Sequence, residues 1–433
     1  RRARPGGHWV DAYPFVRLHQ PSRFYGVNST PLGADDLESV GAEAGSARRA
    51  SGTEICAYYE SIMRHRLAAS GRVRFFPMCD YLGDRRLRSL VSGKGTDVAV
   101  RRQVVDASYM ASRVPATDPP PFAVDEGARC VPPGALTQLT EPAAGYVVVG
   151  GGKTGMDTIC WLLEQGTDPG DITWICPQDS WLLNRAYFQP DRALTLEAFT
   201  LHLEAIVASE TVDEVFRRLE TEGVMVRIDP SADPTMAKGA TVDLSELELL
   251  RRVENVVRGG HVQRITTDRV ILDQGEIATS PGHLHVHCAA PGLPDDPPRP
   301  IFEEDGITLQ LVTRIGLTLS GALQGFLEST GRSTREKNQL CRPTGMPHTP
   351  FDYLRAILSG IQTELGWADA PDLQAWLDST RLNLLSGLAT REDAATVGEL
   401  QGRFLTAVFP ALEQFGSFTA AATPRERARI GAP

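Results

Sequence analysis

A glycine-rich turn in the middle of the sequence is the feature that most constrains this chain. The apolar run Tyr146–Val149 leads into Gly150-x-Gly152-x-x-Gly155, and a helical pattern follows over 158–164. In such a strand–turn–helix unit the first glycine permits the tight turn, the second lets a pyrophosphate approach the backbone, and the third lets helix and strand pack closely. Phosphates then lie at the helix N-terminus, where free N–H groups favour an anion. The pattern predicts a Rossmann-like dinucleotide site.

Length and charge narrow the class of protein. The 433 residues are enough for two or three hydrophobic cores. A formal net charge of −10 argues against a nucleic-acid surface. The chain lacks an uninterrupted apolar run of membrane-spanning length. We therefore expect neither a nucleic-acid nor a membrane partner.

Cysteine usage indicates the compartment. The 7 cysteines are scattered and form no CxxC pair, which is typical of a reducing cytoplasm and lacks the pattern of a structural zinc site. We expect a cytoplasmic protein without a metal site. A redox dithiol of the thioredoxin-reductase kind is also excluded, because it needs two neighbouring cysteines.

Periodicity along the rest of the chain predicts an α/β protein whose last part is helical. Apolar spacing predicts helices over 53–70, 196–208, 212–222, 244–257, 351–365, 372–377 and 397–409. Short apolar runs predict strands over 73–76, 87–91, 98–105, 270–272 and 283–289. The proline-rich stretch 115–133 is typical of an extended connector.

Three motifs in chain order resemble a known family. Gly6-Gly7-His8-Trp9, the glycine turn at 150–155 and the late Ala289-Ala290-Pro291-Gly292-Leu293 are similar to segments of flavin-containing monooxygenase-like NAD(P)/FAD-dependent oxidoreductases. The resemblance implies two Rossmann-like dinucleotide-binding domains, in which an FAD domain is split by an inserted NAD(P) domain. The first glycine motif of that family precedes its Gly-Gly-x-Trp segment. We therefore expect roughly 30–35 upstream residues, the first FAD βαβ unit, to be absent from this sequence.

The resemblance also implies a division of the chain. Residues 1–143 would form the first part of the FAD domain, 144–262 the NAD(P) domain, 263–330 the second part of the FAD domain, and 331–433 a helical C-terminal region. In this arrangement the flavin would contact Gly6, Gly7, His8, Trp9, Gly292 and Gln310. The nicotinamide nucleotide would contact Gly150, Gly151, Gly152, Thr154, Gly155 and Met156.

A second strand is expected over Ile172–Cys176, after the glycine turn and its helix, and its end bears on the choice of nucleotide. An NAD-specific site usually places a carboxylate there to bind the ribose 2′-hydroxyl. Here the strand ends at Cys176, and Asp179 and Ser180 lie beyond it. Arg185 is either a ligand of a 2′-phosphate, through its planar fork, or a solvated surface residue. We expect Ser180 and Arg185 to belong to the site and NADPH to be the nucleotide, with NADH as the alternative.

The expected function follows from the resemblance. The chain would be a flavoprotein oxidoreductase that uses NAD(P)H to reduce FAD, and a monooxygenase that acts with O2 on a small organic substrate. The Phe-x-Gly-x-x-x-His-x-x-x-Trp fingerprint of classical members is absent, which keeps two alternatives open. One is a reductase or dehydrogenase with another electron acceptor, and the other is a non-catalytic nucleotide-binding sensor. No side chain is assigned as catalytic, since the cofactor carries the chemistry.

Four further patterns have simpler interpretations. His283, His285 and His287 lie on one strand face and cannot converge on a metal ion by themselves, so we expect a packed polar face. Cys288 points to the opposite face and is expected to be buried. The arginines near 85–102 are expected to be solvated. Lys153 lacks the spacing of a phosphate-binding Walker A lysine.

Overall fold

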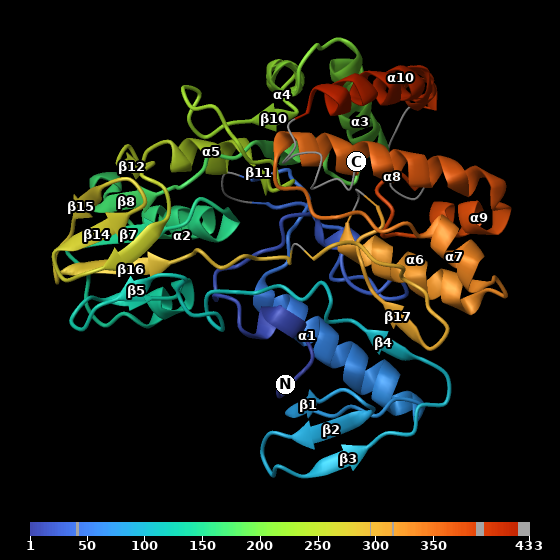
Figure 1. The fold of residues 1–433 in the computed structure, drawn as a ribbon, viewed down its shortest axis with the longest axis horizontal. Coiled ribbons are helices and arrows are strands. Elements are labelled where there is room, and N and C mark those ends of the chain that lie inside the picture. Colours follow the sequence, from blue (N-terminus) through green and yellow to red (C-terminus); the bar gives the residue numbers. More distant parts are fainter. Residues whose placement is uncertain (40–42, 295, 314–315, 387–393, 423–433) are drawn as a thin grey trace.

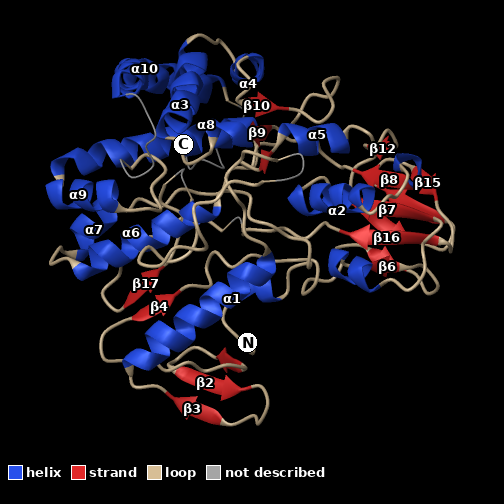
Figure 2. Cartoon of the chain, turned by 180° about the vertical axis from the view of Figure 1, so that it is seen from behind, coloured by secondary structure: helices blue, strands red, loops and turns tan. Residues whose placement is uncertain are grey.

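The computed structural model describes residues 1–39, 43–294, 296–313, 316–386 and 394–422, which form a mixed α/β protein. Figures 1 and 2 show a sheet-containing part around β7, a helical part around α3 and α8, and a small lobe of three strands beyond α1. The helices are α1 (Gly52–Ile62), α2 (Lys153–Glu164), α3 (Arg192–Val207), α4 (Val212–Thr221), α5 (Leu244–Leu250), α6 (Leu317–Ser329), α7 (Thr334–Leu340), α8 (Pro350–Leu365), α9 (Pro371–Ser379) and α10 (Ala394–Ala421). The strands are β1 (Cys79–Tyr81), β2 (Arg86–Ser89), β3 (Gly95–Asp97), β4 (Val104–Asp106), β5 (Ala123–Val124), β6 (Cys130–Val131), β7 (Gly145–Val149), β8 (Ile172–Ile175), β9 (Leu182–Asn184), β10 (Met225–Val226), β11 (Thr241–Val242), β12 (Val256–Val257), β13 (Val262–Ile265), β14 (Arg269–Leu272), β15 (Glu276–Ala278), β16 (His283–His287) and β17 (Gly306–Thr308).

A 5-stranded sheet organises the part of the chain that contains the glycine turn. Its order is β12-β8-β7-β16-β6, and every neighbouring pair is parallel. Because successive side chains point to opposite faces, Val148 packs with apolar residues of α2 and α5, whereas Val147 and Val149 pack against the antiparallel strands β13 and β14. The central strand β7 is therefore covered on both faces, as parallel sheets require.

The helical part has its own core. The longest helices, α3, α8 and α10, share one apolar cluster with α4 and with Trp181. Inside it, the hydroxyl of Tyr353 on α8 lies 3.2 Å from Nε2 of His202 on α3. The helix α8 begins at a capping box in which Thr349 and Asp352 satisfy each other's backbone N–H groups. The predicted helices over 351–365, 372–377 and 397–409 are confirmed as α8, α9 and part of α10. The final residues of the expected helical region, 423–433, lie outside the described residues.

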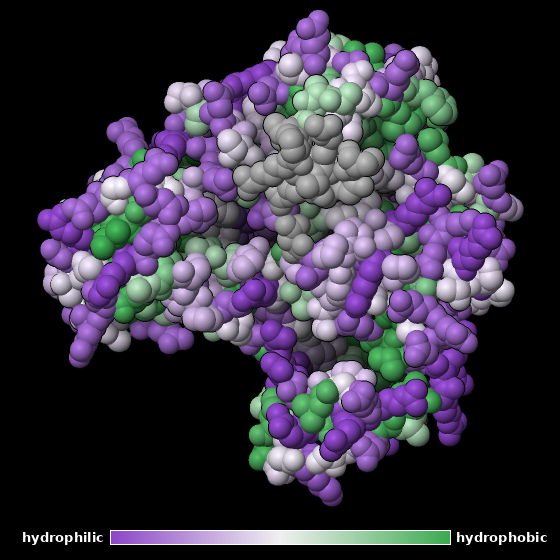
Figure 3. All heavy atoms as spheres, viewed as in Figure 1, coloured by the Kyte–Doolittle hydropathy of each residue, from purple (hydrophilic) through white to green (hydrophobic). Residues whose placement is uncertain are grey.

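The lobe that carries β1, β2 and β3 is the least buried part of the fold. Its three strands form an antiparallel sheet in the order β1-β2-β3. None of the residues 63–106, all of which the structure describes, is buried. Figure 3 shows hydrophobic and hydrophilic side chains intermixed on the surface of this lobe.

A single arginine ties the C-terminal half of the chain to an N-terminal loop. The guanidinium of Arg381 donates to backbone carbonyl oxygens of the loop, among them Tyr25 at 2.9 Å, Asn28 at 3.2 Å and Thr30 at 2.9 Å. Carbonyls of Arg23 and Val27 face the same group. Segments about 350 residues apart in sequence are therefore joined by one side chain.

Four of the predicted elements are wrong. The expected strand 98–105 is one of them, because only Val104 and Val105 of it lie in a strand, β4. The expected strand 73–76 is not a strand, and its residues are exposed. The expected helix 244–257 ends at Leu250, because Val256 and Val257 pair with β8 instead. The connector 115–133 contains β5 and β6, which pair with β13 and β16. Tertiary pairing overrides local pattern in the last two cases.

The parallel sheet crosses the domain boundaries that we expected. Strand β6 precedes residue 144 and strand β16 follows residue 262, and both lie in the sheet of β7. Farther along the chain, β4 and β17 form a separate parallel pair. The assignment of the flanking regions to an FAD domain stays a prediction.

Candidate nucleotide-binding site

The glycine turn joins β7 to α2 as the sequence predicts. The strand ends at Val149 and the helix begins at Lys153, with Gly152 as its N-cap residue and no side-chain cap. The N–H groups of Gly155 and Met156 bond to the carbonyl of Gly152. The N–H groups before them belong to the first turn, which a helix cannot satisfy internally. The turn therefore has the geometry of an anion site at a helix N-terminus.

The three motif glycines are required for different reasons. Gly150 has φ of +131°, which side chains rarely adopt, and a Cβ there would lie 3.0 Å from the carbonyl of Cys288. A Cβ on Gly155 would lie 2.1 Å from the carbonyl oxygen of Gly150. A Cβ on Gly152 would meet nothing within 4 Å. The turn is thus tightly packed on its inner side and open where a pyrophosphate would approach.

The other predicted loop residues divide between surface and core. Gly151 packs against Cys176, since a Cβ would lie 2.6 Å from that sulfur. Met156 is 1% exposed and belongs to the sheet core, although it also lines a pocket beside the loop. The carbonyl of Thr154 accepts from the hydroxyl of Thr158 at 2.7 Å, an ordinary bond within the helix.

Lys153 points away from the open side of the turn. Its ammonium lies 2.8 Å from Asp157 and 3.2 Å from Glu246 of α5. Asp157 also accepts a hydrogen bond of 2.7 Å from the hydroxyl of Tyr13. The ammonium of Lys153 therefore forms ion pairs inside the protein, in agreement with the absence of Walker A spacing.

Arg185 belongs to the same interior group. It is 1% exposed, and its guanidinium donates to Glu43 at 2.8 Å and Glu246 at 2.6 Å. Arg49 completes the group, since it pairs with Glu43 and lies 3.7 Å from Glu246. We call these six residues the ionic cluster, and its members are Glu43, Arg49, Lys153, Asp157, Arg185 and Glu246. Its three cations balance its three carboxylates.

The cluster lowers the pKa of one of its carboxylates, Glu246. Burial by itself raises the pKa of Glu246, but Lys153, Arg185 and Arg49 outweigh that effect and hold the pKa well below its ordinary value. Burial and the neighbouring Asp157 raise the pKa of Tyr13 well above its ordinary value. The hydroxyl of Tyr13 thus keeps its proton and donates it in the hydrogen bond to Asp157.

This geometry fits neither interpretation of Arg185. The residue was expected either to meet a 2′-phosphate or to be a solvated surface residue. It is buried, and two carboxylates already occupy its guanidinium. Neither alternative describes it, because the sequence gives no sign of the distant Glu43 and Glu246 that draw the side chain inward.

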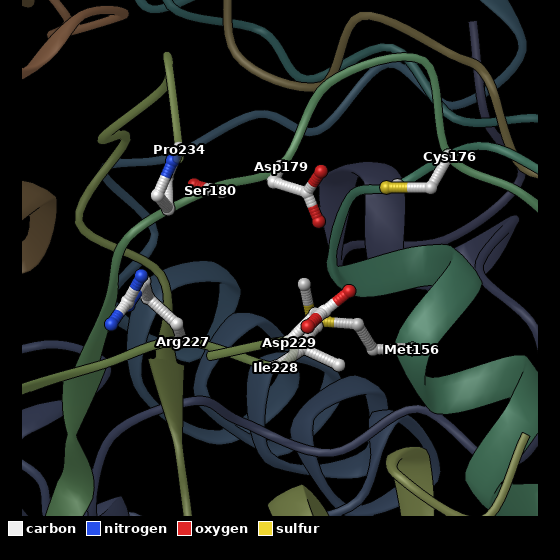
Figure 4. Close-up of a pocket in the computed structure, with 9 residues that line it drawn as sticks. Met156, Cys176, Asp179, Ser180, Arg227, Ile228, Asp229 and Pro234 are labelled. Carbon is white, nitrogen blue, oxygen red and sulfur yellow. The ribbon is translucent and has the colours of Figure 1, made fainter. Parts of the chain in front are cut away.

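A narrow pocket lies beside the glycine turn, at the carboxyl end of β8. Figure 4 shows Asp179 and Ser180 on the segment after β8, facing Arg227 and Asp229 on the segment after β10. The complete lining is Gly151, Met156, Cys176, Asp179, Ser180, Arg227, Ile228, Asp229 and Pro234. Of these, sequence reasoning named Gly151, Met156 and Ser180 as site residues.

Arg258 connects the two carboxylates of this pocket. Its guanidinium donates to Asp179 at 2.7 and 3.1 Å and to Asp229 at 2.9 Å. The residue follows β12, the neighbour of β8 in the sheet. Sequence reasoning missed it because the segment was assigned to a helix. The apolar pair Val256-Val257 ahead of a glycine pair was the available signal of a strand end.

The first segment expected to contact flavin, Gly6–Trp9, is held in place by contacts within the protein. Gly6 and Gly7 have φ of +129° and +58°, and Trp9 donates to the hydroxyl of Tyr25 at 2.6 Å. The rings of His8 and Trp9 are 4.8 Å apart, and burial lowers the pKa of His8. These contacts give the segment a fixed shape, and its role toward flavin stays a prediction.

The two later flavin candidates differ in how available they are. Gly292 has φ of +75°, and a Cβ placed there would meet nothing within 4 Å. Gln310 is 5% exposed, and its side-chain amide bonds to the backbone of Arg299 at 3.0 and 2.8 Å. Both polar atoms of the Gln310 side chain are therefore bonded within the protein. A flavin near this position would have to contact neighbouring residues instead.

The histidine strand is a packed polar face, as expected. Thr279 bonds to His283 at 3.2 Å and to His285 at 3.0 Å, while the ring of His287 packs edge-on against Phe122. Burial lowers the pKa of His285 and His287. Cys288 is 4% exposed and buried on the other side. Within the described residues, no cluster of ligating side chains suits a metal ion.

Two comparisons place little constraint on function. No protein-family model matches the chain. A variant of a flavin monooxygenase from Stenotrophomonas maltophilia aligns with a TM-score of 0.34 and 16% identity, over 67% of this chain and 68% of that chain. A TM-score this low supports no conclusion about fold or function.

Among the described residues, no helix is long and apolar enough to cross a bilayer.

Sequence relatives are found in mycobacteria. The uncharacterized proteins Rv2000 and MT2056 of Mycobacterium tuberculosis and Mb2023 of Mycobacterium bovis are each 44% identical to this chain over 391 residues. Each alignment covers 90% of this chain and 72% of the relative. This extent of identity shows that the chain belongs to the same family as these mycobacterial proteins.

Proposed function

We propose that this protein is an oxidoreductase that binds a reduced nicotinamide dinucleotide at the glycine turn and uses it to reduce FAD. The observation that carries the proposal is the turn itself, which lies between a central parallel strand and a helix and is open at Gly152. Oxygenation of a small organic substrate is the proposed outcome for the reduced flavin. Transfer to another acceptor is the alternative, because the monooxygenase fingerprint is absent.

The residues of the turn would hold the nucleotide mainly through backbone groups. The first N–H groups of α2 and the helix dipole favour the pyrophosphate. The nucleotide, when bound, supplies the hydride. Lys153 is engaged by Asp157 and Glu246, so this cation is held inside the protein. The site then depends on the shape of the turn more than on a charged side chain.

The hydrogen bond between Tyr13 and Asp157 supports a flavin site next to the nucleotide site. It fastens the segment after Trp9 to the first turns of α2. The carbonyl of His19 accepts from Arg185 at 3.3 Å and from Thr241 at 2.9 Å, which anchors the same segment a second time. A flavin held along Gly6–Trp9 would therefore lie on a segment that is fixed to the nucleotide unit.

Calorimetric titration of the protein with NADH and NADPH tests the nucleotide site. Gly152→Asp places a carboxylate where the pyrophosphate would lie, and the open space there lets the fold persist. We expect the substitution to abolish nucleotide binding. Gly325→Asp is the matched control, because this exposed glycine on α6 also has nothing within 4 Å of its Cβ direction. Equal binding by both variants would overturn the proposal.

Flavin absorbance then separates the outcomes. The protein is mixed with FAD and reduced anaerobically with the nucleotide, and oxygenated buffer is added. A long-lived oxygenated flavin spectrum supports a monooxygenase, whereas direct return to oxidised flavin supports a reductase. Binding of nucleotide without flavin reduction would overturn the enzymatic proposal and leave the sensor interpretation.

A further inference from the structure

We infer that the pocket at the end of β8 accepts an adenosine ribose with a free 2′-hydroxyl, which makes NADH the preferred nucleotide. The inference rests on the proposed function, since it concerns the nucleotide at the same glycine turn. It also reverses the expectation of NADPH. The argument depends on where the pocket lies and on which charges surround it.

The position of the pocket suits the adenosine ribose. In a βαβ dinucleotide unit the ribose lies beyond the carboxyl end of the second strand, next to the first glycine turn. Here the second strand is β8, and the pocket is lined by Cys176 at its end and by Gly151 and Met156 of the turn and helix. Pyrophosphate at the turn would thus direct the ribose toward Asp179 and Ser180.

Carboxylates dominate the far side of the pocket. Asp179 and Asp229 come from different segments and face the same space (Figure 4). Both oxygens of Asp179 accept from Arg258, and Asp229 accepts from Arg258 and from both N–H and hydroxyl of Ser231. Each carboxylate oxygen has a second lone pair. Asp179 therefore retains the capacity to accept a hydrogen bond from a ribose hydroxyl.

The cations near the pocket already have carboxylate partners. Arg227 is 8% exposed and donates to both oxygens of Glu220 at 2.8 Å, and to the carbonyl of Ala232. Arg258 is shared by two aspartates. Arg185 and Lys153 belong to the ionic cluster. Among the described residues that line or bridge this pocket, none is a cation without an opposing carboxylate.

A 2′-phosphate would meet an unfavourable field here. Such a group carries close to two negative charges at neutral pH, and it would approach the carboxylates of Asp179 and Asp229. Binding would require Arg258 to leave both of them. A 2′-hydroxyl, in contrast, can donate to Asp179 while the bridge through Arg258 persists. The preference for NADH over NADPH therefore comes from like-charge repulsion of the 2′-phosphate as well as from a new hydrogen bond to the 2′-hydroxyl.

Titration calorimetry with NADH and NADPH as separate probes tests this inference. A hydrogen bond to a charged group corresponds to a preference for NADH of about 10- to 100-fold. The double substitution Asp179→Asn and Asp229→Asn should reduce the preference at least tenfold, mainly through tighter binding of NADPH. Asp233→Asn is the matched control, because its side chain is 86% exposed and is paired with Arg217 instead.

The variant Arg258→Met tests whether Arg258 is the group that recognises the nucleotide. If the inference holds, NADH remains the tighter ligand in this variant. Tighter binding of NADPH than of NADH by the unaltered protein, or an unchanged preference in the double variant, would overturn the inference. Failure of both nucleotides to bind would instead contradict the proposed function, so the two failures are distinguishable.

Discussion

The glycine-turn unit and the three-stranded lobe, both built on short strands, differ in what surrounds their charges and apolar groups. In the unit, β7 is covered on both faces, and the ionic cluster sets three cations against three carboxylates. In the lobe, none of the residues 63–106 is buried. Parallel strands need cover on both faces, whereas the lobe is held chiefly by hairpin hydrogen bonds.

Charge shows the same contrast. The lobe carries ten cationic side chains and three carboxylates over 63–102, namely Arg64, Arg66, Arg72, Arg74, Arg85, Arg86, Arg88, Lys94, Arg101, Arg102, Asp80, Asp84 and Asp97. The whole chain has a net charge of −10. Overall charge therefore describes neither region, because one is locally neutral inside and the other is basic and solvated. The expectation that the arginines near 85–102 are exposed is confirmed.

The largest effect is expected from the ionic cluster. Arg185→Met removes one buried cationic partner from both Glu43 and Glu246 and leaves the cluster with an excess of carboxylates, so we expect the free energy of unfolding to fall by about 3–5 kcal/mol. Urea denaturation measures it. Arg217→Met is the control, with a side chain that is 44% exposed. Similar stabilities of the two variants would contradict the idea that the cluster is a strongly coupled buried group.

A smaller loss is expected at the glycine turn. A Cβ on Gly155 overlaps the carbonyl of Gly150, so Gly155→Ala should cost about 1–3 kcal/mol in unfolding free energy and weaken nucleotide binding. Gly152→Ala should leave stability nearly unchanged, because its Cβ direction is open. Thermal unfolding and calorimetry together check both variants. The prediction fails if Gly152→Ala is the more destabilising of the two.

Acid should weaken the unit through Glu246. Its pKa in the folded protein lies well below the unfolded value of about 4.3. The stabilisation is therefore fully present above that unfolded value and is lost as the pH falls toward the folded pKa. Glu246→Gln should show a smaller decline of unfolding free energy between about pH 5 and pH 3. Parallel declines in variant and parent would show that other carboxylates control acid unfolding.

The smallest effect is expected in the lobe. Val91 is 80% exposed, so Val91→Ser should change the unfolding free energy by no more than about 0.5 kcal/mol. The matched change Val148→Ser, at a residue with 0% exposure, should cost several times more, because it buries a hydroxyl in the sheet core. A large effect at Val91 would show that the lobe is covered in solution.

Sequence reasoning succeeded where one local pattern determines the geometry. The strand–glycine turn–helix unit at 145–164 is present as predicted, because its spacing defines both backbone and packing. It failed for Arg185 and Arg258, whose partners lie far away in sequence. It also failed at Val256 and Val257, where pairing with β8 prevailed over a helical pattern. Long-range ion pairing leaves no local signal, so these ion pairs could not be deduced. The edge strand left only a short one, the apolar pair Val256-Val257 ahead of a glycine pair.

The guanidinium of Arg381 has a consequence for how the chain is made. In the loop over 23–30, the carbonyls of Tyr25 and Asn28 accept from Arg381, a residue synthesised about 350 positions later. Tyr58, which bonds to Val27 and Thr30 of the same loop, is synthesised much earlier. At about 5–20 residues per second, roughly twenty seconds to a minute separate the synthesis of the loop from that of Arg381 on the ribosome. During that interval the carbonyls of Tyr25 and Asn28 lack the donor that they have in the folded protein, and water satisfies them instead. The contacts of Arg381 with this loop therefore form late in the synthesis of the chain.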